Sequence, residues 1–179
     1  MTEHILHTND LPALLHTLSA GDRILLSGTV YTARDAAHAR LCDMLAQGEV
    51  LPFPLQGATV YYAGPTEAPP DRPIGSCGPT TSGRMDGFTP TLLKAGLCCM
   101  IGKGERSAAV IDAMVRNGAV YLCAIGGAGA LAAKCITACE VIAFPELGCE
   151  SIKRLTFADF PLIVGIDAKG NSVFKPRSL

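Results

Sequence analysis

The sequence predicts an α/β protein that forms a single domain, residues 1–179, around a mixed sheet. Through the middle of the chain, short apolar segments rich in β-formers alternate with segments of helical period. Both ends of the chain are more purely strand-like. A regular doubly wound sheet would need the alternation throughout, so a mixed sheet fits better. A chain of 179 residues is long enough to bury one sizeable core.

The first half of the chain predicts two strands and one helix. Residues 23–30 (RILLSGTV) are apolar and β-rich, which predicts a strand. Residues 34–45 place apolar side chains at helical spacing and predict a helix. Residues 57–63 (GATVYYA) predict the second strand, and a proline-rich stretch over residues 64–79 predicts a loop.

The second half of the chain continues the alternation and then ends in strands. Helices are expected where glycine follows a periodic segment, with Gly96 and Gly118 as stops. The expected helices are residues 86–95, 107–117 and 129–134; the expected strands are 97–101, 119–125 and 140–144. A terminal hairpin is expected from residues 160–167 and 172–174, turning at Gly170-Asn171.

The charge balance excludes several classes of partner. The chain has 15 basic and 16 acidic residues, and binding to nucleic acid or a membrane surface would need a basic excess.

The first ten residues lack the pattern of a secretory signal. The longest uncharged run, between Arg116 and Lys134, is shorter than the roughly 20 residues of a membrane span. We therefore expect a soluble, cytoplasmic protein.

The eight cysteines do not form a recognisable metal motif. No Cys-x-x-Cys occurs, and the spacing matches neither zinc nor ferredoxin patterns. Without a secretory signal, disulfides are not expected. Most cysteines lie among apolar residues, which predicts small buried side chains and no metal ligand on this chain.

The richest polar motif is Gly-Pro-Thr-Thr-Ser-Gly-Arg-Met-Asp at residues 78–86. Three consecutive hydroxyls precede an expected helix, whose N-terminus offers unpaired N–H groups and a positive dipole end. With Arg84, this segment predicts a cradle for a carboxylate or phosphate. The alternative is an ordinary helix cap beside a surface arginine.

A second strand-to-helix junction lies at residues 28–38 (GTVYTARDAAH). Arg34 falls in the first helical turn, where a cation opposes the helix dipole, and this placement indicates that Arg34 faces an anion. His38 follows four residues later on the same helical face and is the side chain that titrates near neutrality. The alternative is a salt bridge between Arg34 and Asp35, with His38 at the surface or in the core.

Two glycine-rich segments raise the question of a nucleotide site. Lys103 lies between two glycines, but the full phosphate-loop pattern is absent, which favours a single substrate-contacting lysine. Residues 127–132 satisfy Gly-x-Gly-x-x-Ala, with Glu146 at a suitable distance for a dinucleotide fingerprint. This rival interpretation predicts a dinucleotide-binding module. The alternative is a tight turn with close helix–strand packing.

Taken together, the motifs resemble the class I fumarase and tartrate dehydratase family. The resemblance covers roughly residues 5–175 and rests on Gly-Thr-x-x-Thr-x-Arg-Asp-Ala-Ala-His at 28–38, Gly-Pro-Thr-Thr-Ser-x-Arg-Met-Asp at 78–86, Lys-Gly-x-Arg-Ser at 103–107 and Pro-Glu-Leu-Gly-x-Glu at 145–150. It implies a swivelling β/β/α fold that is either the C-terminal domain of a long chain or a separate β subunit.

The resemblance also implies a cofactor held elsewhere. In this family a 4Fe–4S cluster is bound by three cysteines of the other domain or subunit, and its open iron acts as a Lewis acid on the departing hydroxyl. The eight cysteines of this chain are then bystanders. The chain is expected to be active only with an α subunit, in a hetero-oligomer for which α2β2 is one arrangement.

The resemblance assigns substrate binding to five residues of this chain. Arg34 and Arg84 would bind the substrate carboxylates, since the guanidinium fork suits a carboxylate. Thr80, Ser82 and Lys103 would complete the binding of the substrate.

The resemblance assigns proton transfer to Thr81, either as the base that removes the C3 proton or as the residue that positions this base. A threonine hydroxyl is too weakly acidic to act unaided, and Lys103 and Arg34 would supply a positive field. His38 is kept as a second acid/base candidate.

The details of the motifs favour hydration of fumarate to L-malate, with L(+)-tartrate dehydration as the alternative. An alternative of another class is a binding module for a dinucleotide or a small dicarboxylate, without hydro-lyase activity.

Overall fold

The computed structural model describes residues 2–174, which form one α/β domain. The strands are β1 (Glu3–His7), β2 (Arg23–Thr32), β3 (Thr59–Tyr61), β4 (Cys99–Gly102), β5 (Val120–Cys123), β6 (Ile136–Ala143) and β7 (Ile152–Ile166). The α-helices are α1 (Leu11–Leu14), α2 (Asp35–Gln47), α3 (Thr89–Lys94), α4 (Ala108–Asn117) and α5 (Gly129–Lys134). Short 3₁₀ segments cover Leu15–Thr17, Ser82–Met85 and Pro145–Glu150.

The sheet mixes parallel and antiparallel strands, as the sequence predicts. Strands β1 to β5 run parallel in the order β1-β2-β3-β4-β5. The long strand β7 runs antiparallel to β2, β5 and β6. Because β7 pairs with both β2 and β5, the ladder β2-β3-β4-β5-β7 closes on itself.

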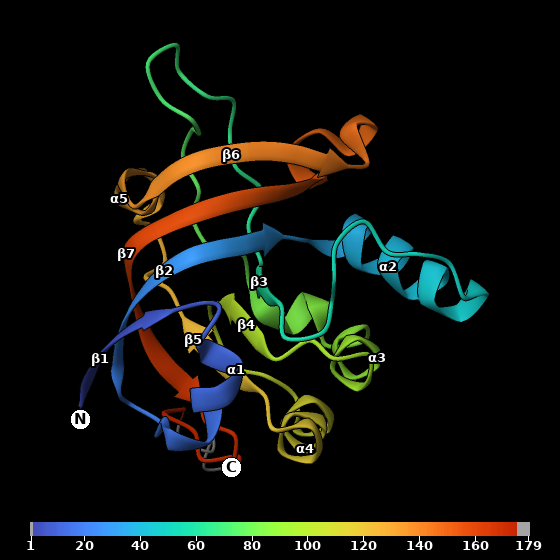
Figure 1. The fold of residues 1–179 in the computed structure, drawn as a ribbon, viewed down its shortest axis with the longest axis vertical. Helices are drawn as coiled ribbons and strands as arrows, with labels where there is room; N and C mark the ends of the chain where they lie inside the picture. Colours follow the sequence, from blue (N-terminus) through green and yellow to red (C-terminus); the bar gives the residue numbers. More distant parts are fainter. Residues whose placement is uncertain (1, 175–179) are drawn as a thin grey trace, which may run out of the picture.

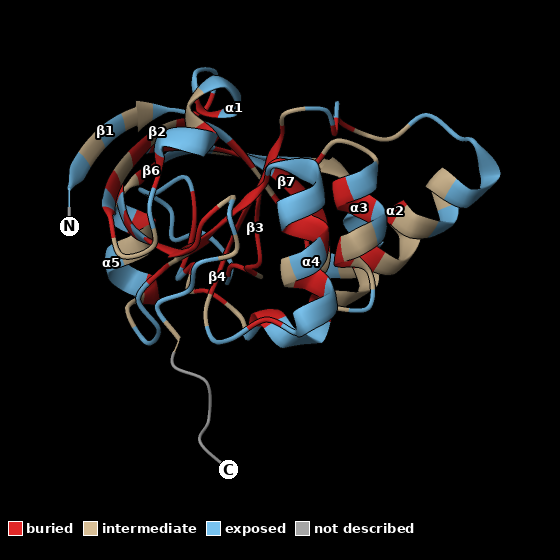
Figure 2. Ribbon diagram, turned by 90° about the horizontal axis from the view of Figure 1, so that it is seen from below, coloured by how far each residue is buried: buried red, intermediate tan, exposed pale blue. Residues whose placement is uncertain are grey.

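The closed ladder and its helices form a β/β/α arrangement. Figure 1 shows β2, β6 and β7 on one side of β3, β4 and β5, with α2, α3 and α4 on the other side. The central strands therefore bury alternate side chains in two cores. The core between the strands contains Tyr61, Ile101 and Leu122, and the core under the helices contains Val60, Met100 and Tyr121. Figure 2 shows the buried faces of α3 and α4 turned toward the strands.

The predicted helix boundaries hold best where capping residues mark them. Ser107 caps α4 by accepting a hydrogen bond from the Val110 N–H, and Gly118 ends the helix in a left-handed conformation. The helix α2 likewise ends at Gly48, with φ of 69°. The helix α5 has the predicted bounds.

Several expected elements differ from the structure in extent; the strand expected over residues 140–144, for example, is β6, Ile136–Ala143. The helix expected over residues 86–95 is shortened to α3, because a 3₁₀ segment and the turn at Gly87 precede it. The expected terminal hairpin is confirmed in part: its first strand, residues 160–166, is the second half of the 15-residue strand β7, and after the turn the Val173 N–H donates to the Gly165 carbonyl at 2.9 Å. Ser172 forms a single bridge to Ile166 in place of a second strand. The strand β1 at the N-terminal end was not predicted.

The parallel strands bring four chain segments to one edge of the sheet. The chain leaves β2, β3, β4 and β5 at their carboxyl ends, toward Arg34, Gly64, Lys103 and Gly126 respectively. Ligands in such sheets bind outside the carboxyl ends of the strands. Within residues 2–174, no helix has the length and apolar character needed to cross a bilayer.

Candidate active site

The hydroxyl-rich segment of residues 79–82 lies along the carboxyl edge of β3 and β4. Pro79 bridges to Ala63, just beyond β3. The Thr80 N–H donates to the Tyr62 carbonyl at 2.7 Å, and the Ser82 N–H donates to the Lys103 carbonyl at 2.9 Å. The segment therefore joins two strand ends as an extra short piece of the sheet.

This pairing places Thr81 directly beside Lys103. The two residues form a parallel β-bridge. Thr81 is exposed and Lys103 is half-buried against the turn at Gly126. Within residues 2–174, neither the Thr81 hydroxyl nor the Lys103 ammonium group forms a hydrogen bond or ion pair. Two of the predicted site residues are thus adjacent and available to a ligand.

Arg84 reaches the same edge but is already paired. Its Nη2 lies 2.8 Å from Asp35 Oδ2, and its Nε donates to Asp35 Oδ1 at 3.1 Å. Asp35 is the first residue of α2, where a carboxylate is favoured by the helix dipole. The pair connects the hydroxyl-rich segment to the start of α2.

Arg34 lies at the N-cap of α2, just before the first helical turn in which the sequence placed it, and it faces a carboxylate of the protein itself. Its partner is Glu150, at 3.5 Å from Nη2 to Oε1, and the alternative pairing with Asp35 is not found. The Arg34 Nε is buried and has no hydrogen-bond partner among the described residues. Gly64 makes room for this side chain, because a Cβ at Gly64 would lie 2.7 Å from Arg34 Nη1.

Ser82 and Thr80 are less accessible than Thr81. The Ser82 side chain is fully buried, and its hydroxyl lies 2.8 Å from the Tyr121 hydroxyl. Tyr121 in turn donates to the Gly104 carbonyl at 3.0 Å. Thr80 is half-buried. Ser82 therefore supports the hydroxyl-rich segment from its buried side. Its binding to substrate stays a prediction.

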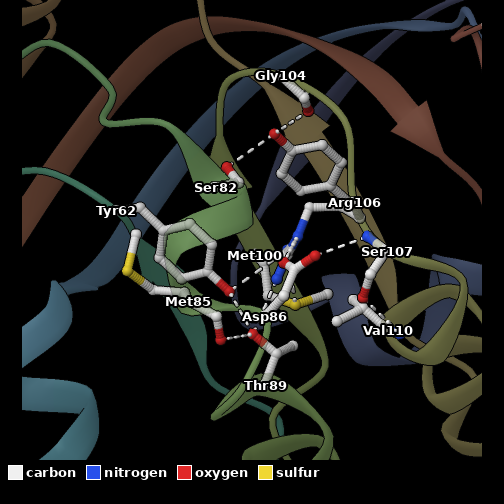
Figure 3. Close-up of polar contacts among 11 residues, drawn as sticks. Tyr62, Ser82, Met85, Asp86, Thr89, Met100, Gly104, Arg106, Ser107 and Val110 are labelled. Carbon is white, nitrogen blue, oxygen red and sulfur yellow. Dashed lines mark hydrogen bonds and ion pairs between the residues drawn. The ribbon is translucent and has the colours of Figure 1, made fainter.

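A buried arginine joins the two motif loops beneath the site (Figure 3). The Arg106 Nε donates to Asp86 Oδ1 at 2.7 Å, and Asp86 Oδ2 accepts from the Ser107 N–H at 2.6 Å. The guanidinium also donates to Thr89 Oγ1 at 2.8 Å and lies 5.1 Å from the centre of the Tyr121 ring.

The sequence interpretation gave no role to Asp86, Arg106 or Tyr121. Asp86 and Arg106 lie at or next to the ends of two quoted motifs. Their opposite charges are the signal that could have indicated an ion pair between these motifs. Nothing in the sequence around Tyr121 distinguishes it from an ordinary core tyrosine.

His38 lies in the core below the edge. The side chain is fully buried, and its Nδ1 lies 2.9 Å from the Arg34 carbonyl. A carbonyl only accepts, so Nδ1 carries a proton. Burial lowers the pKa of His38 to about 4. At neutral pH, His38 is therefore a poor base, and its assignment as an acid/base group stays untested.

We expect His38 to make the protein less stable in mild acid. The unfolded state binds a proton near pH 6.5, whereas the folded state does so only near pH 4. The free energy of unfolding should therefore fall by about 3 kcal/mol between these pH values. Urea titrations at a series of pH values would measure this. A His38→Asn variant keeps a donor at the Nδ1 position and should lose most of the pH dependence; an unchanged slope would contradict the assignment.

The turn before α5 is a packing turn. A Cβ at Gly129 would lie 2.3 Å from Ser76 Oγ, and the Gly129 carbonyl accepts from the Cys77 N–H at 3.0 Å. The dinucleotide interpretation needs a parallel strand after the helix. Here β6 follows α5 and pairs antiparallel with β7. Gly129 therefore serves close packing against residues 76–78, which precede the hydroxyl-rich segment.

The cysteines are dispersed. Within residues 2–174, no three His, Cys, Asp or Glu side chains lie close enough to hold a metal ion. Burial raises the pKa of Cys77 to about 12 and those of Cys98 and Cys123 to about 11, which disfavours the thiolate that binds metals. The residues of this chain do not fit the ligand set of an iron–sulfur cluster.

The fold is a β/β/α domain. At the carboxyl edge of its parallel strands, Arg34 and Arg84 are each ion-paired with a protein carboxylate. The adjacent side chains of Thr81 and Lys103 are available to a ligand. The sequence profile described as Fumarase C-terminus matches residues 2–177. This chain therefore belongs to the fumarase C-terminus family.

Individual relatives agree with this assignment. The anaerobic class I fumarate hydratase of Escherichia coli strain K12 is 40% identical over 168 residues, which are 93% of this chain and 31% of that protein. Fumarate hydratase 2 of Leishmania major is 41% identical over 156 residues, 86% of this chain and 28% of that protein. A putative L(+)-tartrate dehydratase subunit beta of Methanocaldococcus jannaschii is 37% identical over 164 residues, 88% of this chain and 84% of that subunit. The chain spans less than a third of the fumarate hydratases it matches but most of the beta subunit.

Proposed function

We propose that this chain is the β subunit of an iron–sulfur hydro-lyase that interconverts fumarate and L-malate. The observation that carries the proposal is the backbone pairing of Thr81 with Lys103 at the carboxyl edge, with Arg34 and Arg84 held at the adjacent start of α2. A dicarboxylate needs cations at both ends and a polar group near the reacting carbons. This edge offers both.

The two arginines act as carboxylate ligands. Arg84 contacts Asp35 through both Nε and Nη2, so its guanidinium presents its fork to a carboxylate at this edge, whereas Arg34 lies near Glu150 through Nη2 alone, at 3.5 Å. A substrate carboxylate binds by joining or replacing these side-chain partners. The Arg34 Nε has no hydrogen-bond partner among residues 2–174 and can donate to a substrate carboxylate.

Thr81 and Lys103 act at the reacting carbons. The Thr81 hydroxyl needs help to lose its proton, because its ordinary acidity is far too weak. The neighbouring Lys103 ammonium group supplies a positive charge that favours an alkoxide. Thr81 is then the residue that takes up or positions the proton from the substrate carbon.

The 4Fe–4S cluster that the family uses belongs in this proposal to a partner α subunit. Within residues 2–174 the cysteines form no cluster of three metal ligands, and burial raises the pKa of Cys77 and of Cys99, which does not fit cluster ligation. Every role assigned to this chain is therefore one of binding, orientation or proton transfer.

Dehydration of L(+)-tartrate is the second candidate function. It is favoured by the beta subunit of Methanocaldococcus jannaschii, of which this chain covers 84%. The fumarate hydratases of Escherichia coli strain K12 and Leishmania major named above have higher identities, 40% and 41% against 37%. Fumarate is therefore the preferred substrate.

The proposal is tested with the complex of this chain and the iron–sulfur α chain of the same organism. The complex is assembled anaerobically and assayed with fumarate, L-malate and L(+)-tartrate, with each chain alone as a control. Turnover of fumarate and L-malate by the complex alone is expected. Turnover of only L(+)-tartrate would favour the second candidate, and turnover of none of them would overturn the hydro-lyase assignment.

Arg34→Lys and Arg84→Lys should each raise KM about 10–100-fold in this complex, with a smaller change in kcat. Lysine keeps the charge but loses the two-pronged contact, and a hydrogen bond to a charged group contributes about 1.5–3 kcal/mol. Steady-state kinetics with malate measure the effect. Arg116→Lys, in the exposed last turn of α4, is the matched control. Unchanged KM values for both site variants would remove the arginines from the binding site.

A further inference from the structure

The buried lysine at the start of β7 has no role in the reaction described above. The Lys153 residue is only 8% exposed. Its Nζ donates to Ser151 Oγ at 2.6 Å and to the carbonyls of Gly148, Cys149 and Ser151 at 3.1, 3.3 and 3.4 Å. An ammonium group has three donors, and all can be satisfied here. Burial removes water from around the ammonium group and lowers the pKa of Lys153.

The segment that Lys153 holds is a strained turn. The Pro145–Glu150 turn contains Gly148 at φ 59°, and it begins after Phe144, which is left-handed at φ 55° although it carries a side chain. The carbonyls of Gly148 and Cys149 at its end, and that of Ser151 just after it, converge on one point. Converging carbonyl dipoles repel one another unless a cation or donor lies between them, and the Lys153 ammonium group occupies this position.

Glu150 ends this turn and connects it to the start of α2. Its Oε2 accepts a hydrogen bond from the Ala36 N–H at 3.0 Å, which satisfies an open donor in the first turn of the helix. Its Oε1 pairs with Arg34 Nη2. The turn thus determines where the Arg34 guanidinium lies.

A second contact ties the turn to β2. The Thr32 hydroxyl donates to the Ser151 carbonyl at 3.3 Å and accepts from the Lys153 N–H at 3.0 Å. Thr32 is the last residue of β2, two positions before Arg34. The turn, the end of β2 and the start of α2 are therefore one connected unit with Lys153 at its centre.

We infer that Lys153 is a positioning residue: its ammonium group fixes the 145–150 turn and thereby sets Glu150 against Arg34 and the first turn of α2. The inference rests on the proposed function insofar as Arg34 binds a substrate carboxylate. The structural part, from Lys153 to Glu150 to Ala36, stands independently of any activity.

The structural part is tested by hydrogen exchange of the Ala36 amide in this chain. In Lys153→Met, this amide should exchange at least about tenfold faster, because the turn no longer holds its Glu150 acceptor in place. Lys94→Met, at an exposed position of α3, should leave it unchanged. Ser151→Ala removes one acceptor and should act in the same direction more weakly, so it serves if Lys153→Met does not fold. Ala36 exchange that neither Lys153→Met nor Ser151→Ala accelerates would overturn the inference.

The functional part is tested in the assembled complex. Lys153→Met should raise the KM for malate about tenfold with kcat within about twofold, a pattern of lost substrate binding. Glu150→Gln should do the same, and the double variant should be no worse than either, since both act through one path. Additive losses would overturn the coupling. If Arg34→Lys leaves KM unchanged while Ala36 exchange responds to Lys153→Met, Arg34 is removed from the substrate site and the structural inference stands.

Discussion

Thr81→Ala is expected to lower kcat of the assembled enzyme by about 10²–10⁴-fold, with little change in KM. The Thr81 side chain is exposed at the carboxyl edge, and its hydroxyl has no partner among residues 2–174. Removal of the hydroxyl should therefore not lower the stability of the fold. Its bridge to Lys103 is formed by the backbone and survives the substitution. The loss should appear in the chemical step, where the hydroxyl takes part in proton transfer.

Two further variants separate chemistry from local disturbance. Thr81→Ser keeps the hydroxyl and should retain most of the activity. Thr91→Ala removes an exposed hydroxyl of α3 and should behave as wild type. Initial rates with fumarate, measured anaerobically, give kcat and KM for each. Near-wild-type turnover of Thr81→Ala would remove Thr81 from the chemistry and return attention to His38.

The helices that the sequence predicts well are those with local end signals. Ser107 and Gly118 mark α4 with contacts that involve only nearby residues, so pattern and structure agree. The strand β7 could not be recognised over its whole length. Polar and charged residues interrupt its first half, which is nevertheless paired with β2 on one side and β6 on the other. Its pairing with β2 depends on residues more than 100 positions away, which no local pattern contains.

At the site, too, the sequence revealed local motifs but not contacts between distant segments. Sequence motifs indicated Arg34, Thr81 and Lys103, and the structure brings Thr81 and Lys103 together. The sequence could not show that Arg34 pairs with Glu150, because the two lie on segments far apart in the chain. It also placed His38 on the face of α2 that includes Arg34 without showing that the ring is buried under Tyr62. Burial decides the protonation state of such a group, and burial is a property of the fold.

Asp86→Ala is expected to lower the free energy of unfolding by about 3–5 kcal/mol. The Arg106 side chain has no exposed surface, and Asp86 is the only carboxylate paired with it among residues 2–174. Removal of Asp86 leaves a buried cation with one strong hydrogen bond, to Thr89, and two aromatic rings. Removing one partner of a buried ion pair costs more than the pair itself contributes, because the other charge stays desolvated.

Urea unfolding compares this variant with a matched surface pair. Arg154 and Glu140 have side chains more than half exposed, so Glu140→Ala should cost less than about 1 kcal/mol. Adding Arg106→Met to Asp86→Ala should recover part of the loss, since methionine fills similar space without a charge. The Asp86 carboxylate also accepts from the Ser107 N–H, so this double variant should stay below wild type. A loss for Asp86→Ala no larger than that for Glu140→Ala would show that the Arg106 network does not hold the two motif loops together.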